Sequence, residues 1–394
     1  MVIASAGLAD AAPSPQKGLL PEWVGSRAVL HGQDPYQPEV ARQIANGLYP
    51  GEHLSGSEVD QHRFAYPVFF AFLFFPAAVL PFEVAQKFAL AGGALLTYLS
   101  IGWWLHDNRP GKLAALTMAL LVFASYPTVL ALQLRQPTLI IAAVLAAAFS
   151  GLRSGRMVPA GILAGLSTAK PQLAIAVVLP LSIWSLARWR QRKAFLLSLS
   201  ATVSALLMAS ERVVPGWFSH WLSTLLAYSH YTGANPLLQD ALARYGFLPA
   251  AMLLVGAVVW ASWKFQDTDL LFAVSLSVAS FQLLFLFQIY NEILLLPALL
   301  WLVENAGAIR ARGQLHRLLL GCVWILLATG WAGAAGLTAL NRLLPGWGLT
   351  LWQLPLAAAW LCPWAVFLTL AWFAFSSQKQ PHLTSPTPAM LRRF

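Results

Sequence analysis

The sequence has 394 residues, of which 58% are hydrophobic and only 10% are charged, and its formal net charge is +10. A soluble domain normally carries about 25% charged residues, so the composition excludes an ordinary soluble protein. The basic residues are scattered among short loops between apolar segments, which indicates membrane topology rather than nucleic-acid binding. Both cysteines lie in apolar segments, so neither a disulfide framework nor a metal cluster is indicated. We therefore predict an all-α protein that crosses a membrane several times.

The N-terminal part of the chain is polar and the remainder is apolar. Residues 1–17 carry no fold signal and are expected to be a disordered leader. Residues 18–83 are expected to be a loop outside the membrane. Within this loop, the apolar stretch 66–82 contains three prolines, which disfavour a straight spanning helix. We expect it to form a helix that lies in, or dips into, the outer interface.

About 11 spanning helices are expected within residues 84–375, because apolar runs long enough to cross a bilayer recur there. The expected segments are 84–105, 113–131, 137–150, 157–169, 171–188, 194–213, 248–264, 269–287, 292–304, 316–340 and 350–375. Most basic residues then fall in loops on one side, among them Arg153, Arg188 and Arg310. That side should be cytoplasmic, together with the disordered tail 376–394, which places residues 18–83 on the extracytoplasmic side.

Polar side chains on the predicted extracytoplasmic side gather in three places. The first loop contributes Glu22 and Asp34, and the loop 214–247 contributes His220 and His230. Short turns between apolar segments contribute Arg135, Gln136, Lys170, Tyr290, Asn291 and Glu292. Amide and carboxylate side chains are costly near lipid, so those of the last turn are expected to face a protein-lined site.

These residue types together suit a substrate that carries a phosphate and a lipid tail. Arg135 and Lys170 could neutralise a phosphate leaving group, and a carboxylate could take a proton from an incoming hydroxyl. Other interpretations remain open. Arg135 and Lys170 could snorkel to lipid headgroups, and Asp34 could cap the turn before the proline that follows it. His220 and His230 fit an interface position better than catalysis.

Three stretches of the sequence resemble glycosyltransferase family 87, whose members are bacterial membrane mannosyltransferases of the C-type glycosyltransferase superfamily. The stretches are WVGSRAVLHGQDPYQPE, RFAYPVFFAFLFFPAAVLPF and LQLRQPTLIIAAVLAAAFSGLRSGRMVPAGILAGLSTAKPQ. The shared features are a small-residue helix ending in G-x-D-P-Y, a Y-P before an apolar helix, a G/R-Q-P/N turn, and A-G-x-x-x-G followed by K-P. Their order and spacing over residues 20–175 carry the resemblance, since no single motif is specific.

The resemblance implies an enzyme of the bacterial inner membrane, with C-type architecture and with residues 84–375 as its transmembrane catalytic domain. Such an enzyme transfers a hexose, typically mannose, from a polyprenyl-phosphate donor to a lipid- or glycan-linked hydroxyl. Transfer takes place on the extracytoplasmic face, with inversion and without a nucleotide sugar. We expect no cofactor, and we expect membrane lipids but no nucleic acid among the partners.

In this family an aspartate of the first outer loop acts as the base or positions the acceptor. It often stands at the position of Gly18 in this chain. The expected catalytic carboxylate here is therefore Asp34, with Glu22 as the second choice. Arg135 and Lys170 are expected to bind the donor phosphate. The expected sugar or acceptor contacts are Tyr36, Gln136, His230, Tyr290, Asn291 and Glu292.

Two other functions remain open at this point. A transporter or flippase of lipid-linked sugars would also have many helices and intramembrane polar groups, but such proteins often show internal repeats, and no clear repeat is evident. A catalytically inactive relative that scaffolds envelope assembly is supported by Gly18 in place of the aspartate. The first spanning helix of the family also has no counterpart in residues 1–30, so we expect the natural start to lie upstream.

Overall fold

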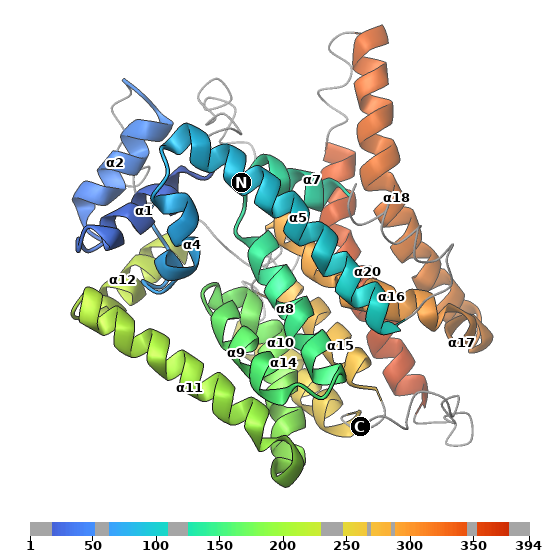
Figure 1. Ribbon diagram of the computed structural model, residues 1–394. Helices are drawn as coiled ribbons and strands as arrows, with labels where there is room; N and C mark the ends of the chain where they lie inside the picture. The colour runs from blue at the N-terminus through green and yellow to red at the C-terminus, as the bar shows by residue number, and fades with distance from the viewer. Residues whose placement is uncertain are drawn as a thin grey trace.

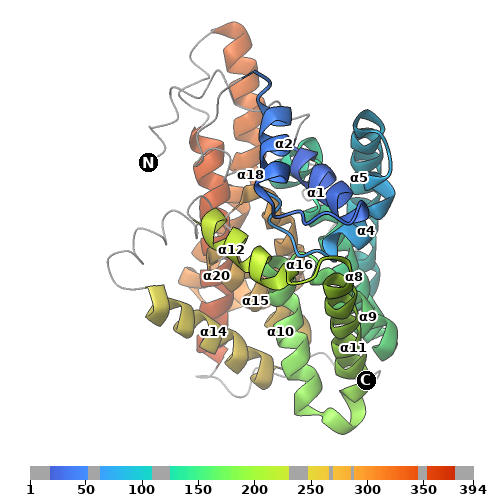
Figure 2. The same cartoon turned by 90° about the vertical axis from the view of Figure 1, so that its left-hand side faces the viewer.

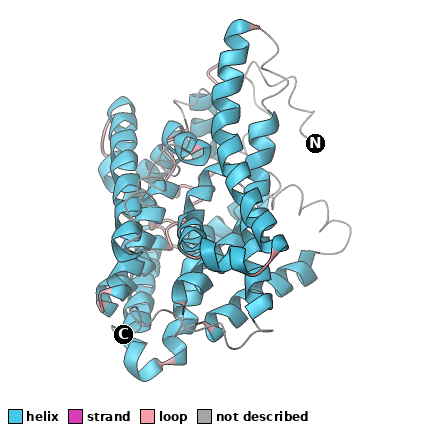
Figure 3. Ribbon diagram, turned by 90° about the vertical axis from the view of Figure 1, so that its right-hand side faces the viewer, coloured by secondary structure: helices cyan, strands magenta, loops and turns pink. Residues whose placement is uncertain are grey.

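The computed structural model describes residues 18–51, 63–108, 125–229, 247–265, 269–284, 288–344 and 353–377. Every regular element in these ranges is a helix, as the composition predicts (Figure 3). The leader, His230, most of the expected span 113–131 and nearly all of the tail lie outside the described residues.

Three short helices form a unit at one end of the molecule, which we call the N-terminal unit: α1 (Leu20–Leu30), α2 (Pro38–Leu48) and α4 (Phe70–Ala78) (Figure 1). A proline stands in the first turn of both α1 and α2, where its missing N–H leaves no helical hydrogen bond unmade. Phe64 packs on Gly25, and its ring occupies the place that a side chain at Gly25 would need. Trp23 Nε1 donates to the Leu80 carbonyl oxygen at 3.1 Å, which ties α1 to the segment after α4.

The helix α4 is too short to cross a membrane. Its nine residues span about 14 Å at 1.5 Å per residue, whereas the hydrocarbon core of a bilayer is about 30 Å thick. Pro76 lies inside this helix. The stretch 66–82 is therefore not one straight spanning helix, in line with the three prolines in its sequence.

The remaining helices form a bundle around α15 (Figures 1 and 2). The first half of the bundle consists of α5 (Phe82–Asn108), α7 (Tyr126–Gln133), α8 (Thr138–Arg153), α9 (Met157–Ser167), α10 (Pro171–Ala187), α11 (Trp189–Val213) and α12 (Trp217–Ser229). The second half consists of α14 (Phe247–Lys264), α15 (Leu270–Leu284), the 3₁₀ helix η3 (Ile289–Leu295), α16 (Leu296–Glu304), α17 (Ala306–Ala311), α18 (Gln314–Leu343) and α20 (Gln353–Ser377). The helix α15 is buried at every position from Leu271 to Leu284, because α10, α14, α16 and α20 surround it.

Four described helices are long and apolar enough to cross a membrane: Phe82–Leu105, Trp189–Val213, Gln314–Leu337 and Ala357–Ser376. Most of the other expected spans correspond to shorter apolar helices, such as Met157–Ser167 and Pro171–Ala187. The expected span 292–304 begins inside η3 and continues as α16. The expected spans 157–169 and 171–188 correspond to the separate helices Met157–Ser167 and Pro171–Ala187, so the break before Pro171 was predicted from the sequence.

A basic turn lies at the end of the bundle opposite to the N-terminal unit. Here α10 ends and α11 begins (Figures 1 and 2), and residues 188–193 include four arginine and lysine side chains. From this turn, α11 runs back to α12, which lies beside the N-terminal unit. Trp217 of α12 contacts Phe69 edge to face, with ring centroids 6.0 Å apart.

Small residues allow α9 and α11 to approach each other closely. A Cβ atom added to Gly161 would collide with Ser198 Oγ and with the Phe195 carbonyl oxygen, and one added to Gly165 would lie 2.7 Å from Thr202 Cβ. Glycines four residues apart on one helix face are a common device for close helix packing in membranes. The A-G-x-x-x-G motif of the sequence is therefore a helix-packing motif in this fold.

The substitution Gly161→Ala is expected to destabilise the protein by about 1–3 kcal/mol, because the new methyl group forces α9 and α11 apart. The matched control is Gly256→Ala on α14, where a Cβ atom would meet nothing within 4 Å. That change should stabilise by up to about 1 kcal/mol through helix propensity. Thermal unfolding in detergent measures both, and equal shifts in Tm would contradict the packing role of Gly161.

Candidate functional site

A lysine is buried where the N-terminal unit meets the bundle. Lys170 precedes α10 and is 3% exposed. Its Nζ donates to Thr138 Oγ1 at 2.8 Å. The same atom lies 5.3 Å from the ring centroid of Tyr290 and 5.8 Å from that of Tyr66. One hydroxyl and two aromatic faces thus surround the ammonium group, and both kinds of contact favour a cation.

Two further residues hold the hydroxyl that Lys170 contacts. Thr138 Oγ1 donates to Asn291 Oδ1 at 2.8 Å, and Gln282 Nε2 donates to the Asn291 carbonyl oxygen at 2.7 Å. Thr138, Asn291 and Gln282 come from α8, η3 and α15, and all three are buried. The position of the Lys170 ammonium group is therefore fixed by a network that reaches the centre of the bundle.

A carboxylate from the N-terminal unit lies near the same lysine. Glu22 on α1 is 4% exposed, and its Oε1 accepts a hydrogen bond from Tyr66 Oη at 2.9 Å. Its Oε2 has no hydrogen-bond partner among the described residues. Tyr66 therefore contacts Glu22 through its hydroxyl and Lys170 through its ring.

Burial shifts the pKa of both charged groups in the direction of the neutral form. It raises the pKa of the Glu22 carboxyl, and the hydrogen bond from Tyr66 and the positive charge of Lys170 offset part of that rise. It lowers the pKa of the Lys170 ammonium group to about 8, and the negative charge of Glu22 offsets part of that fall. Each group thus stabilises the charge of the other in a poorly hydrated place.

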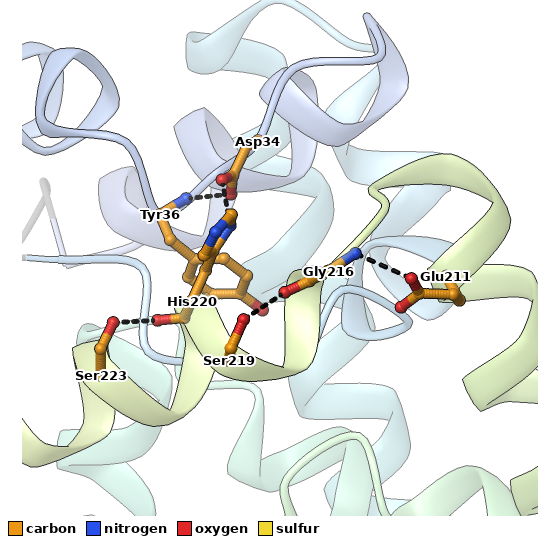
Figure 4. Close-up of polar contacts among 7 residues, drawn as sticks. All are labelled: Asp34, Tyr36, Glu211, Gly216, Ser219, His220 and Ser223. Carbon is orange, nitrogen blue, oxygen red and sulfur yellow. Dashed lines mark hydrogen bonds and ion pairs between the residues drawn. The ribbon is translucent and has the colours of Figure 1, made fainter.

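Asp34, the first choice for the catalytic carboxylate, lies in the turn between α1 and α2 (Figure 4). Asp34 Oδ1 accepts the Tyr36 backbone N–H at 3.0 Å, and Asp34 Oδ2 lies 2.7 Å from Nδ1 of His220 on α12. Tyr36 Oη donates to the Tyr66 carbonyl oxygen at 2.7 Å. A chain of contacts thus joins Asp34 to Glu22 and Lys170 by way of Tyr36 and Tyr66.

The turn between α7 and α8 carries Arg135 and Gln136 and leads directly into Thr138. Arg135 has a left-handed backbone, with φ of 53°, and its Nη1 donates to the Gln133 carbonyl oxygen. A non-glycine residue in this conformation costs about 1 kcal/mol or more and is enriched at functional sites. The Gln136 Oε1 atom is buried without a hydrogen-bond partner among the described residues.

Gly18 packs against this same turn. A Cβ atom at Gly18 would lie 2.8 Å from the Leu134 carbonyl oxygen, so an aspartate does not fit here unless the turn moves. Glu22 stands four residues further on, which is about one helical turn.

The structure brings most of the sequence-predicted candidates together. Lys170, Tyr290 and Asn291 meet directly or through Thr138, and Glu22, Tyr36 and Asp34 join them through Tyr66. Glu292 is the neighbour of Asn291 in η3 and is partly buried.

Sequence reasoning passed over Thr138, Gln282 and the Asp34 contact of His220. The available signals were a threonine that opens an apolar helix and a lone glutamine inside α15, since polar groups in apolar helices usually have a partner.

The long apolar helices indicate a membrane protein, and buried charged groups such as Lys170 and Glu22 are found preferentially at functional sites. The family model described as "Glycosyltransferase family 87" matches residues 64–287, which is more than half of the chain. The chain therefore belongs to glycosyltransferase family 87. No curated protein and no solved structure matches it significantly.

Family membership makes the chain a membrane glycosyltransferase, with a sugar donor and an acceptor as its substrates. The matched region contains Tyr66, Thr138, Lys170, His220 and Gln282, whereas Glu22 and Asp34 precede it. The family match and the resemblance noted over residues 20–175 share residues 64–175. The match then continues to residue 287.

The substitution Thr138→Val is expected to lower sugar transfer at least tenfold, because it removes the acceptor of Lys170 and the donor to Asn291. Unpaired buried polar groups cost about 1–3 kcal/mol each. Thr138→Ser keeps the hydroxyl and should retain most of the activity. The control is Thr369→Val, since among the described residues the buried Thr369 hydroxyl bonds only within its own helix, to the Ala365 carbonyl oxygen at 2.6 Å. Equal activity of both valine variants would contradict the proposed network.

Proposed function

We propose that this enzyme transfers a hexose, with mannose as the first candidate, from a polyprenyl-phosphate donor to a lipid- or glycan-linked hydroxyl. The observation that carries the proposal is the buried ammonium group of Lys170, fixed by Thr138 beside two tyrosine rings. Such a cation suits a phosphate that gains charge as it leaves the sugar, because preorganised charge in a dry site is strongly stabilising. A nucleotide sugar is not needed in this scheme.

The donor phosphate would bind between Lys170 and the turn that carries Arg135. An ammonium group has three N–H donors, and Thr138 accepts from one of them. Arg135 lies three residues before Thr138, and arginine binds phosphate in bidentate geometry. Gln136, Tyr290, Asn291 and Glu292 are the candidates for contacts with the sugar, and His230 is a candidate on the acceptor side.

The two carboxylates have different roles in this proposal. Glu22 keeps Lys170 charged, which is supported by the mutual pKa effects of the two groups. Asp34 is more accessible, with 14% of its side chain exposed, and serves the acceptor side. Transfer with inversion is a single displacement, so the acceptor hydroxyl must lose its proton to a group on that side.

The active site would face the extracytoplasmic space of a bacterial inner membrane. The basic residues 188–193 lie at the opposite end of the bundle from the N-terminal unit (Figures 1 and 2), and basic loops favour the cytoplasm. The shorter apolar helices would complete a C-type bundle of about 11 crossings. Exposed apolar side chains on α11, among them Leu197, Leu207 and Met208, offer a surface to lipid tails.

The direct test uses membranes that contain the full chain and polyprenyl-phosphate-[14C]mannose. We expect label in a lipid or glycan product, and Lys170→Met should reduce transfer about 100-fold or more. The matched control is Lys264→Met. The Lys264 ammonium group also lies over an aromatic ring, that of Trp260 on α14, but it has no assigned role in the site. Undiminished transfer by Lys170→Met would contradict the assignment of Lys170. Movement of the labelled donor across the bilayer without covalent transfer would point to a flippase.

The pH dependence of transfer should report the Lys170 charge. Only the protonated amine attracts phosphate, and its pKa of about 8 means that the charge is lost as the pH rises through that value. We expect kcat/KM to fall above about pH 8, roughly tenfold per pH unit. Lys170→Arg keeps its charge to much higher pH, so its residual activity should not fall in this range. An unchanged alkaline limb in Lys170→Arg would assign that limb to another group.

A further inference from the structure

The contact between Asp34 and His220 has the geometry of a base and its orienting carboxylate. We propose that His220 Nε2 accepts the proton of the acceptor hydroxyl and that Asp34 is the positioning residue that holds the imidazole. The inference rests on the proposed function and deepens it, since it assigns the acceptor side of the same site.

The hydrogen bonds of Asp34 leave the imidazole better placed than the carboxylate to take the proton. The two Asp34 oxygens already accept from the Tyr36 backbone N–H and from His220 Nδ1, at 3.0 and 2.7 Å. The Asp34 side chain is 14% exposed, whereas that of His220 is 50% exposed. A neutral imidazole that donates from Nδ1 carries its free lone pair on Nε2. An incoming hydroxyl can therefore reach Nε2 more readily than it can reach the carboxylate.

Contacts on either side of His220 fix α12 against the N-terminal unit. Trp221 Nε1 donates to the Ala65 carbonyl oxygen at 3.1 Å, and the Trp217 ring meets Phe69 edge to face. The turn before α12 is held by Glu211, whose Oε1 accepts the Gly216 N–H at 2.8 Å (Figure 4). Gly216 has φ of +72°, which a glycine adopts without strain. The imidazole thus projects from a helix that is anchored next to Tyr66.

A chain of contacts joins the proposed base to the proposed phosphate site. Asp34 binds the Tyr36 N–H, and Tyr36 Oη donates to the Tyr66 carbonyl oxygen. The Tyr66 ring and hydroxyl contact Lys170 and Glu22. A displacement reaction needs a base for the incoming oxygen and a cation for the departing phosphate, both held in one rigid frame.

The transfer step balances with these groups. His220 Nε2 takes the hydroxyl proton of the acceptor as the acceptor oxygen forms a bond to C1 of the hexose. The bond between C1 and the phosphate oxygen breaks, and its electron pair leaves with the polyprenyl phosphate, which gains one negative charge beside Lys170. Asp34 stays ionised and stabilises the imidazolium, which then releases its proton to water.

A purely structural role makes a different prediction. A surface ion pair contributes little to stability, so a simple tie between α12 and the N-terminal unit would affect stability slightly and would leave the chemical step intact. An added base could not replace such a tie. Chemical rescue therefore separates the two roles.

The experiment measures transfer from polyprenyl-phosphate-[14C]mannose in membranes that contain the full chain. His220→Ala should lower kcat about 100-fold or more, with the donor KM within about twofold of the wild-type value. Added imidazole should restore activity in a saturable manner. His220→Gln should be equally impaired, although its amide can still reach Asp34, and Asp34→Asn should lose activity without rescue by imidazole.

The matched control is His31→Ala. His31 is also exposed, and its Nδ1 contacts a backbone carbonyl oxygen, that of Arg27, at 2.7 Å instead of a carboxylate. This variant should keep its activity, with no response to imidazole. Undiminished activity of His220→Ala, or a loss that imidazole does not repair, overturns the assignment of His220 while the proposed function stands. A wild-type protein that transfers no label overturns the proposed function and this inference with it.

Discussion

The buried charge of Lys170 is the constraint on which the arrangement of the site depends. An isolated ammonium group is costly to bury, so the surrounding structure must supply a hydrogen-bond acceptor, polarizable faces and an opposite charge. Thr138, Tyr290 and Tyr66 supply the first two, and Glu22 supplies the third. These groups come from elements distant in sequence, so the site exists only when the N-terminal unit is docked on the bundle.

The sequence was informative about the fold where polarity changes sharply along the chain. The expected segment 248–264 is the helix Phe247–Lys264, and 316–340 lies within Gln314–Leu343, because apolar helices begin and end near charged or turn-forming residues. It was less informative about where the backbone departs from a regular α-helix. The expected spans 157–169 and 171–188 are the separate helices α9 and α10, whereas η3 replaces the start of the expected span 292–304, because packing around Asn291 decides the backbone there.

The same division applies to the candidate site. Lys170, Asn291 and Glu22 could be singled out because charged and amide side chains are conspicuous in an apolar chain. Thr138 is unremarkable in the sequence, and Tyr66 stands out there only as part of the Y-P motif. Their importance to the site arises from tertiary contacts such as the one between Thr138 and Asn291, which are 153 positions apart. The two interpretations of Asp34, as a turn cap and as a catalytic group, are compatible. One of its oxygens accepts the Tyr36 backbone N–H of the turn, and the other contacts His220.

The boundary of the family match separates Asp34 from His220, its partner in the proposed acceptor site, because the matched residues 64–287 contain His220. Residues 64–287 include the groups assigned to the phosphate, whereas the α1–α2 segment, which holds Asp34, comes before them. Under the proposed function, sequence drift in that early segment would change the partner of His220 without replacing Arg135 or Lys170 themselves. Related enzymes would thus differ in their acceptors through changes in the α1–α2 segment, while the matched region stays the same.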